Sequence, residues 1–296
     1  MDISKHDDNI MIPVGGLLNT GSICYLNSLL QSLLSCTSIT EFFLSNKKRF
    51  VDGDNILAIE YINLINQFSN NTNNPIDPSG VFSALVKVLR KKYPQKKFGD
   101  GQEDVNEGFH MFLDSINDGG LYKLFMHRYK ICIWCIDCNK QVSVQTDESC
   151  VVEISGDYIP LSNTTYHPIN KQILEYMSKV SDYKCPSCGN TRCLRFYQIS
   201  YAPEIIPVVF TKYHKKNKID FPEHLSLPAL TGGVLRYILV SKVEHSGGRN
   251  GGHYWVDCYR KNRQGEKKIF NVNDSSVMLG NFVPSRDTYM IFYHSV

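Results

Sequence analysis

Apolar positions in the first part of the chain recur at helical spacing. A first amphipathic helix is predicted to begin near Cys24. Its apolar residues at i, i+3, i+4, i+7 and i+8 are Leu26, Leu29, Leu30, Leu33 and Leu34. The same periodicity predicts helices over residues 56–65, 81–89 and 105–116, with a turn-rich loop from Ser69 to Pro78 and a stop at Asp118-Gly119-Gly120. The first ~120 residues are therefore predicted to be mostly helical.

After Leu124 the pattern changes to the alternation and β-rich runs of strands. The predicted strands cover Gln141–Gln145, Val151–Ile154, Phe196–Tyr201, Ile205–Phe210, Leu235–Val243, Tyr254–Tyr259 and Tyr289–Tyr293. One helix, from Lys171 to Val180, is predicted to interrupt them. No internal repeat and no linker long enough to separate independent domains is found. The economical prediction is an α+β enzyme whose lobes share one core.

Composition and charge narrow the class of protein. The chain has 296 residues, 42% of them hydrophobic, which is enough for a sizeable core and excludes a disordered chain. Its formal net charge is +3, from 32 basic and 29 acidic residues, far from the concentrated basic character of nucleic-acid-binding proteins. No apolar run approaches the ~20 residues of a membrane span, and the polar N-terminus lacks the apolar stretch of a signal peptide. We therefore expect a soluble, unexported protein in the cytoplasm or nucleus, a monomer that binds neither nucleic acid nor membrane.

Cys24 is a candidate nucleophile because it lies at the start of its predicted helix. Unpaired N–H groups and the partial positive charge of a helix N-terminus favour a thiolate there. The alternative for a single cysteine is a buried, inert packing residue. Asn19, five residues upstream in the same turn, carries a side-chain amide that can donate to a developing oxyanion.

His253 is the candidate base, and the arithmetic of a hairpin gives it a partner. The run from Tyr254 to Tyr259 is followed by a turn centred on Arg263 and a return strand from Lys268 to Val272. Positions paired across that turn have numbers that sum to 526, so His253 is predicted to face Asn273. An Asn there can hold the imidazole in one tautomer, and Asp274 is predicted to point to the other face. The alternative for His253 by itself is a surface histidine at a strand end.

Two Cys-x-x-Cys pairs predict a metal site. Cys135 and Cys138 form the first pair, Cys185 and Cys188 the second, and 46 residues separate the pairs. Four thiolates fill the tetrahedral sphere of Zn²⁺ and leave no position for an activated water, so the zinc is predicted to be structural. Cys132 with Cys135 is an alternative first pair, and these two cysteines are also an alternative redox dithiol. The remaining cysteines away from the helix start are predicted to be packing residues: Cys36, Cys150, Cys193 and Cys258.

The segment from Gln102 to Glu107 opens the fourth predicted helix with acidic residues. Carboxylates in a first turn usually serve the helix dipole. The functional alternative is that Asp104 and its neighbours recognise a basic peptide.

Taken together, these residues resemble the ubiquitin-specific protease family of deubiquitinating cysteine proteases. The segment Gly16–Gln31 is similar to that family's cysteine box over its whole length, and His245–Tyr254 to its histidine box. Gln102–Glu107 resembles its Gln-Gln-Asp box, with Glu103 in place of the second Gln. Val272–Val277 matches the segment that carries the third catalytic residue, and Tyr289–Tyr293 the closing strand.

The resemblance implies a papain-like cysteine protease fold with a helical thumb, a β-sheet palm and zinc-bearing fingers. It implies a catalytic domain over residues 15–295, with the thumb at about 15–121 and the fingers and palm at about 122–295, after an N-terminal extension of residues 1–14. Structural Zn²⁺ is the implied cofactor.

The resemblance also implies an activity, partners and roles. The activity is hydrolysis of the peptide or isopeptide bond after the C-terminal Gly-Gly of ubiquitin, with ubiquitin and ubiquitinated proteins as partners. Cys24 would be the nucleophile, His253 the base and acid, Asn273 the orienting residue and Asn19 the oxyanion donor, with Asp274 as a further catalytic candidate. The implied substrate-binding residues are Gln102, Asp104, Gly252 and Tyr254.

Two other functions stay open at this point. The chain can be a protease for another ubiquitin-like modifier, because a shared Gly-Gly tail would satisfy the same cleft. It can also be a weakly active, zinc-stabilised module that holds ubiquitin without cutting it. Cys24, Asn19 and His253 argue against the second function, since a binding scaffold needs none of them.

Overall fold

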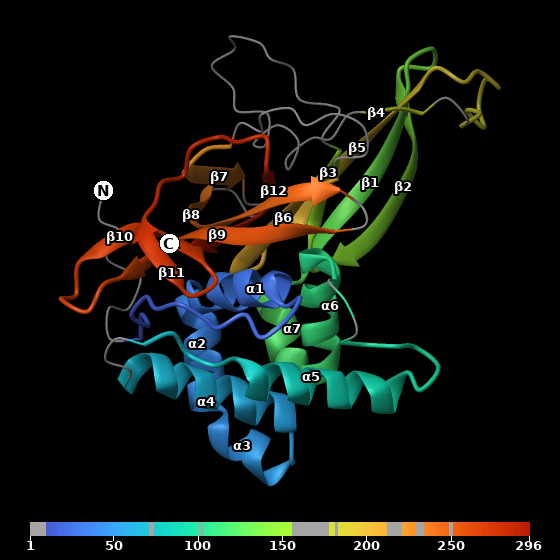
Figure 1. The fold of residues 1–296 in the computed structure, drawn as a ribbon. Coiled ribbons are helices and arrows are strands. Elements are labelled where there is room, and N and C mark those ends of the chain that lie inside the picture. Colours follow the sequence, from blue (N-terminus) through green and yellow to red (C-terminus); the bar gives the residue numbers. More distant parts are fainter. Residues whose placement is uncertain are drawn as a thin grey trace.

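A helical layer packs beneath a large β-sheet, and a second, smaller sheet projects from one end, as the computed structural model in Figure 1 shows. The structure describes residues 10–70, 74–99, 101, 103–155, 178–180, 183–211, 221–228, 234–248 and 251–296. Within these ranges no helix combines the length and apolar character needed to cross a membrane. The description below concerns these residues.

The helices precede the strands along the chain. The described residues form α1 Cys24–Leu34, α2 Thr37–Ser45, α3 Lys47–Asp52, α4 Ile56–Asn70, α5 Ser79–Lys92, α6 Val105–Ile116 and α7 Gly119–Phe125. The four helices predicted from apolar spacing are confirmed as α1, α4, α5 and α6. Helix α4 takes up the first two residues of the predicted loop at 69–78.

Three short helices, α2, α3 and α7, are not among the predicted elements. The predicted stop at Asp118-Gly119-Gly120 is in fact a start. Helix α6 ends because Asn117 adopts the left-handed conformation, with φ 49°. The carboxylate of Asp118 then accepts hydrogen bonds from the N–H groups of Gly120 and Leu121 at 2.8 and 3.2 Å and caps α7.

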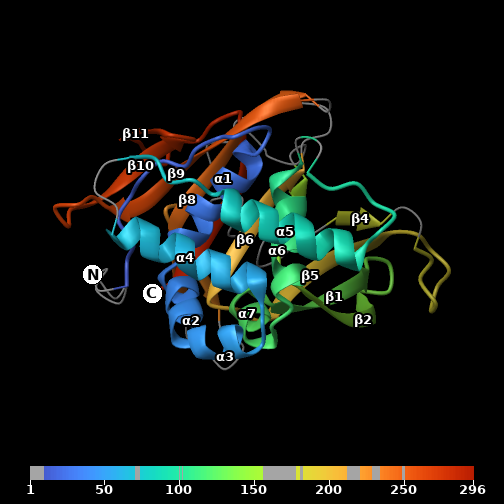
Figure 2. The ribbon, with the colours of Figure 1, turned by 60° about the horizontal axis from the view of Figure 1, so that its bottom comes forward.

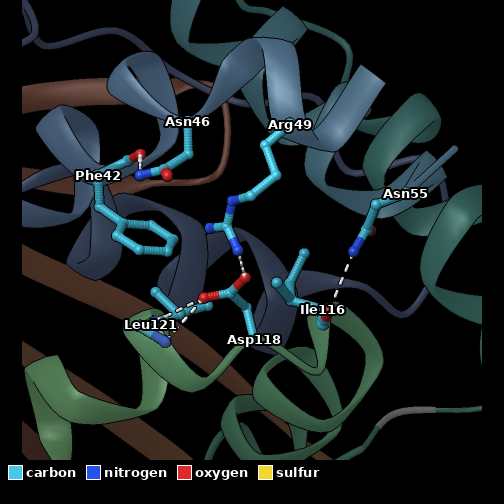
Figure 3. A network of polar contacts seen from close by, with 8 residues as sticks. Phe42, Asn46, Arg49, Asn55, Ile116, Asp118 and Leu121 are labelled. Atoms are coloured by element: carbon cyan, nitrogen blue, oxygen red, sulfur yellow. Dashed lines mark hydrogen bonds and ion pairs between the residues drawn. The ribbon is translucent and has the colours of Figure 1, made fainter. Parts of the chain in front are cut away.

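The same Asp118 ties α3 to the α6–α7 junction (Figure 3). The guanidinium of Arg49 forms an ion pair with the second oxygen of Asp118, and the amide of Asn55 donates to the carbonyl of Ile116 at 2.9 Å. Burial works against ionisation of Asp118, but Arg49 and the two capping N–H groups outweigh it and lower the pKa of this carboxyl. Asp118 therefore caps α7 and, through its ion pair with Arg49, links α7 to α3.

The strands form two sheets. They are β1 His127–Cys135, β2 Lys140–Ser149, β3 Val152–Ser155, β4 Ser178–Val180, β5 Cys193–Tyr201, β6 Ile205–Thr211, β7 His224–Pro228, β8 Val234–Gly248, β9 Gly251–Lys261, β10 Lys267–Asn273, β11 Ser276–Leu279 and β12 Thr288–Ser295. The small sheet has the order β2-β1-β5-β4, and the large sheet has the order β11-β10-β9-β8-β12-β6-β3, with β7 paired to β8. The seven strands predicted from alternation and the return strand of the hairpin are all confirmed.

The predicted helix from Lys171 to Val180 is wrong at its C-terminal end. Ser178, Lys179 and Val180 form β4 and pair with β5, because an edge of the small sheet is available to them. Residues 171–177 lie outside the described part of the chain. The strands β1, β7 and β11 are further elements that the apolar pattern did not predict.

Helix α1 lies at the junction of the two layers. All of its residues are buried, polar ones included. It packs against β8, β9 and β10 on one side and against α2 and α6 on the other, which Figure 2 shows from below. A single apolar cluster runs through both layers by way of this helix. The start of α1 is therefore fixed between the helices and the large sheet.

The segment before α1 is anchored to β9 by a buried arginine. The side chain of Arg260 is fully buried and donates to the carbonyl oxygens of Ile12 and Pro13, each at 2.8 Å. It also donates to the side-chain oxygen of Gln31 in α1 at 3.2 Å, while the amide of Gln31 donates to the carbonyl of Gly15 at 2.7 Å. Residues 12–15 are thus held against both the sheet and α1.

Candidate active site and metal centre

Cys24 is the first residue of α1, as the sequence predicts. It is 3% exposed and lies where α1 meets the large sheet. The first turn of α1 has no acidic side chain to neutralise the helix dipole, and its N-terminal neighbour Ile23 provides no side-chain cap. The positive end of the helix dipole at Cys24 is therefore not neutralised by an acidic side chain of its own first turn.

Asn19 is held rigidly in the turn before Cys24. Its side-chain oxygen accepts from the N–H groups of Gly21 and Ile23 at 3.2 and 3.4 Å. Its side-chain nitrogen donates to a carboxylate oxygen of Asp274 at 2.9 Å. One N–H of this amide is thereby used, and the second N–H is the group that can donate to an oxyanion.

Asp274, just after β10, connects this end of β10 to α1 and to the segment before it. Its second carboxylate oxygen accepts from the side-chain amide of Asn27 in α1 at 2.8 Å, and its backbone carbonyl accepts from the N–H of Leu17 at 2.9 Å. Gly16 is required here, because a Cβ would come within 2.4 Å of the carbonyl oxygen of Ser275. Asp274 therefore fixes Asn19 and the first turn of α1 relative to β10.

His253 and Asn273 form the predicted pair. The Nε2 atom of His253 lies 2.6 Å from the side-chain oxygen of Asn273. Because that oxygen only accepts, Nε2 carries the proton and Nδ1 is left as the basic nitrogen. The ring of His253 also stacks on Trp255, with centroids 6.1 Å apart. The imidazole is thus oriented by an amide on one side and an indole on the other.

The register behind that pairing differs from the predicted one. The observed β9–β10 pairs, such as Lys261 with Lys267 and Val256 with Val272, have numbers that sum to 528 and not 526. The turn is centred one residue later, because Asn262 and Glu266 close it with backbone and side-chain hydrogen bonds. A shift of two in the sum keeps every side chain on its predicted face, so His253 and Asn273 meet as diagonal neighbours.

Asp104 joins α6 to two tyrosines of the large sheet. One carboxylate oxygen accepts from the N–H groups of Asn106 and Glu107 and caps α6. The other accepts from the hydroxyl of Tyr254 at 3.2 Å and from that of Tyr289 at 2.6 Å. The structure therefore gives Asp104 a role in holding the helix against β9 and β12, next to His253.

Tyr254, the residue after His253 on β9, is buried beside Asp104. Burial, Asp104 and, more weakly, the charge of Cys24 raise the pKa of the Tyr254 hydroxyl. The ring of His245 stacks on that of Tyr254 with centroids 4.3 Å apart. Gly252 leaves space for this arrangement, because a Cβ there would lie 2.3 Å from Nε2 of His245. Gln102 lies outside the described residues.

The four predicted metal ligands meet at the tip of the small sheet. The sulfur atoms of Cys135, Cys138, Cys185 and Cys188 all lie within 4.8 Å of one another. The pairs Cys135 with Cys188 and Cys138 with Cys185 are each 3.7 Å apart. Four sulfurs placed tetrahedrally at ~2.3 Å from one ion are about 3.8 Å from each other, so the spacing fits a metal–tetrathiolate centre. Cys132 is not a member of this cluster.

Both Cys-x-x-Cys segments have turns suited to metal binding. Asn139 and Gly189, the residues after each second cysteine, adopt positive φ angles of 50° and 75°. Burial opposes ionisation of Cys185, but the N–H groups of Ser187 and Cys188, together with the neighbouring cysteines, outweigh it and lower its pKa to about 6. The four cysteines can therefore bind a metal ion.

Three residues of the site are absent from the sequence-based prediction. Asn27 is a polar residue on the apolar face of α1, and this break in the apolar pattern indicates a specific hydrogen-bonding role. Tyr289 begins the last predicted strand, but its partner Asp104 is 185 positions away. Trp255 is two positions after His253 and so lies on the same face of β9; the predicted strand is enough to place the two side chains together.

Comparison with known proteins gives one consistent family. The sequence model of that family, described as ubiquitin carboxyl-terminal hydrolase, matches residues 15–293. Ubiquitin carboxyl-terminal hydrolase 16 of Arabidopsis thaliana is 25% identical over 94% of this chain. Probable ubiquitin carboxyl-terminal hydrolase 8 of Schizosaccharomyces pombe is 23% identical over 94% of this chain. The chain spans 30% of the first relative's length and 64% of the second's.

Solved structures show the same fold. A chain of the SAGA Ubp8/Sgf11/Sus1/Sgf73 DUB module bound to ubiquitin aldehyde matches with a TM-score of 0.72 at 18% identity, over 100% of this chain and 71% of that one. A second structure, of the Ubp8-Sgf11-Sgf73-Sus1 SAGA DUB module, matches with a TM-score of 0.71 at 17% identity, over 100% of this chain and 69% of that one. The architecture predicted from the sequence is therefore confirmed.

Proposed function

The chain belongs to the ubiquitin carboxyl-terminal hydrolase family, and on this premise we propose that it is a cysteine-type deubiquitinase. Its reaction is hydrolysis of the peptide or isopeptide bond after the C-terminal Gly-Gly of ubiquitin. The observation that carries the proposal is the convergence of Asn19, Asp274, Asn273 and His253 at the start of the helix that begins with Cys24.

The proposed reaction uses each group in turn. With its Nε2 proton held by Asn273, His253 accepts the thiol proton of Cys24 at Nδ1. The thiolate attacks the carbonyl carbon of the terminal glycine, and the second N–H of Asn19 donates to the oxyanion. The imidazolium of His253 gives its proton to the departing amine, and water then hydrolyses the thioester with His253 as base.

Asp274 contributes by holding the oxyanion donor, and it does not contact His253 in the hydrogen bonds described. A freely rotating Asn19 amide would not keep its second N–H directed at the oxyanion. The carboxylate of Asp274 removes that freedom before the substrate arrives, which is the condition for electrostatic stabilisation of a transition state. Asn273 and Asp274 thus serve the base and the oxyanion site respectively.

The proposed tail-binding region lies beside this centre. Gly252 brings bare backbone next to His253 on β9, and Tyr254 with its partner Asp104 follows directly. Gln102 is proposed for this region from the resemblance alone, since it lies outside the described residues. Because the carboxylate of Asp104 already accepts four hydrogen bonds, its contribution to a basic tail is the local negative charge and the position of Tyr254.

We further propose that the metal of the cysteine cluster is structural Zn²⁺. Four cysteine sulfurs with N–H donors suit Zn²⁺, and no protein position is left for a reacting water. The cluster joins the end of β1 and the β1–β2 turn, at Cys135 and Cys138, to the turn before β5 that carries Cys185 and Cys188, so a bound ion stabilises the projecting small sheet.

The structures that resemble this chain bear names that include monoubiquitin and ubiquitin aldehyde, which supports ubiquitin as the partner proposed here. The test is release of a C-terminal fluorophore from ubiquitin. We expect turnover that disappears in Cys24→Ala and persists in Cys132→Ala, with circular dichroism showing that both variants are folded. Turnover that survives Cys24→Ala would contradict the proposal.

A panel of C-terminally reactive probes separates the alternatives. A covalent adduct with ubiquitin that is lost in Cys24→Ala supports the deubiquitinase. An adduct only with a different ubiquitin-like probe would identify a protease for that modifier. Binding of ubiquitin without an adduct or turnover would identify a binding module.

A further inference from the structure

Each cysteine turn of the metal centre supplies one backbone hydrogen-bond donor to a sulfur. In the second turn, the sulfur of Cys185 accepts from the N–H of Ser187 at 3.4 Å. In the first turn, the sulfur of Cys135 accepts one backbone donor, the N–H of Cys138 at 3.4 Å. A metal–tetrathiolate centre carries excess negative charge on sulfur, so each missing donor weakens it.

A fifth cysteine lies beside the first turn. Cys193 is directly opposite Cys135 in the β1–β5 ladder and is fully buried. The N–H of Ile136 bonds to the carbonyl of Arg192, which makes Cys135 and Cys193 a non-hydrogen-bonded pair, the type in which opposite side chains are closest. The side chain of Cys193 packs in one buried cluster with those of Cys135 and Cys185. Its sulfur is outside the group of four that lie within 4.8 Å of one another.

We propose that Cys193 is a supporting residue of the metal centre, whose S–H donates to the metal-bound sulfur of Cys135 as a second donor beside the N–H of Cys138. This inference rests on the proposed zinc and replaces the packing role predicted for Cys193 from sequence. The arrangement gives Cys135 two donors, one from its own turn and one from the neighbouring strand, so the strand register itself contributes to metal retention.

The consequence is a specific dependence on a hydrogen-bond donor at position 193. An apolar side chain of similar size, as in Cys193→Val, keeps the packing and removes the donor. A hydroxyl, as in Cys193→Ser, keeps a donor. Loss of such partners of metal ligands typically lowers affinity by about 10–100-fold, and a thiol is a weak donor, so we expect an effect of about 10-fold.

The experiment measures transfer of zinc from the purified full chain to a chromogenic chelator. We expect release about 10-fold faster in Cys193→Val than in the unsubstituted protein and close to the unsubstituted rate in Cys193→Ser. Cys132→Val is the matched control. Cys132 is another buried cysteine of the small sheet, but on β1 it lies opposite Phe196 and not opposite a proposed metal ligand. This control should leave the release rate unchanged. Cys193→Ala provides a second donor-free variant if Cys193→Val does not fold.

The cobalt-substituted proteins give a readout that packing does not affect. Removing a hydrogen bond from a coordinating sulfur raises the energy of its lone pair, so the sulfur-to-cobalt charge-transfer band should move to lower energy in Cys193→Val and Cys193→Ala but not in Cys193→Ser. Equal release rates and unshifted bands in the donor-free variants would overturn the inference while leaving the zinc proposal intact. Absence of any zinc or cobalt binding by the unsubstituted chain would overturn both.

Discussion

Asn273 and Asp274 are adjacent, yet their side chains serve opposite sides of the candidate active site. Asp274 adopts φ 48°, in the left-handed region, and this turns its carboxylate away from His253 and towards Asn19 and Asn27. Asp tolerates this conformation better than most residues because of its short polar side chain. One backbone angle therefore separates orientation of the proposed base from orientation of the proposed oxyanion donor.

The first prediction is a double-mutant cycle on that division. Asn19→Ala should lower kcat by about 10²–10³ if it removes an oxyanion donor. Asp274→Ala should lower kcat by a similar or smaller factor, because it releases the same amide. The double variant should be little worse than Asn19→Ala, since both changes remove one function.

Stopped-flow or plate measurements of kcat/KM on a fluorogenic ubiquitin substrate check this. Asn273→Ala acts on the base instead, so its effect should multiply with that of Asn19→Ala. Independent, multiplicative effects of Asp274→Ala and Asn19→Ala would show that Asp274 acts elsewhere.

The second prediction concerns the tyrosines on Asp104. Tyr289→Phe removes a 2.6 Å hydrogen bond to a carboxylate, and such bonds contribute about 1.5–3 kcal/mol to stability. Tyr254→Phe removes a longer bond of 3.2 Å and should cost less. Urea unfolding should rank the two in that order. Tyr201→Phe, at a side chain that is 54% exposed, is the matched control and should be neutral.

At the scale of elements, the junction of α6 and α7 depends on one carboxylate. The third prediction is that Asp118→Ala lowers the free energy of unfolding by about 1–2 kcal/mol, because it removes both a helix cap and the ion pair with Arg49. Asp118→Asn keeps an accepting oxygen and should cost less. Arg49→Ala should cost less than about 1 kcal/mol, since Arg49 is 53% exposed.

The pH dependence of this junction has a defined sign. The folded pKa of Asp118 is lowered, so its contribution is present above the unfolded value of about 3.9 and is lost as pH falls through the folded pKa. Thermal melts of the unsubstituted protein and Asp118→Asn should therefore converge at low pH. Equal losses for Asp118→Asn and Asp118→Ala at pH 7 would show that the cap contributes nothing.

The elements that the sequence predicts are those whose burial repeats over several turns or strand positions. Helix α1 and the strands β9 and β12 have strong apolar periodicity, and their existence is predicted correctly. Helices α2 and α3 are too short to show a period, and α7 starts with two glycines that favour a turn in isolation. The hairpin register differs because its closing contacts, from Asn262 to Glu266, are side-chain choices that alternation does not encode.

At the scale of the whole molecule, the fold and several contacts of the candidate site follow from sequence, while the long-range contacts do not. Local motifs and spacing predict the helix start at Cys24, the contact of His253 with Asn273 and the clustering of the four cysteines. The clasp of Asp104 with Tyr254 and Tyr289, and the anchoring of residues 12–15 by Arg260, connect segments that only the tertiary structure brings together. No local pattern specifies such contacts.

The fourth prediction concerns acid stability of the whole chain. Burial lowers the pKa values of His127 and His294 to about 4 each. The unfolded histidines take up protons near pH 6.5, so stability is complete above that value and falls as pH drops towards about 4. Each histidine should cost about 2 kcal/mol between pH 7 and pH 5.

Urea unfolding at pH 7 and pH 5 measures this slope. His127→Phe keeps a ring of similar size and should remove about half of the loss, and His294→Gln should remove the other half. A double variant that still loses about 4 kcal/mol over this range would place the acid sensitivity in other groups.

The hydrogen bonds of Asp274 have a consequence for the order in which the protein is made. Asn19 and Asp274 are 255 positions apart, and Asn27 and Asp274 are 247 apart. A chain synthesised from its N-terminus therefore presents Asn19 and α1 long before Asn273 and Asp274. Until β10 has been synthesised, the proposed nucleophile lacks the residues that are proposed to orient the base and the oxyanion donor, so we expect a chain truncated before β10 to be inactive.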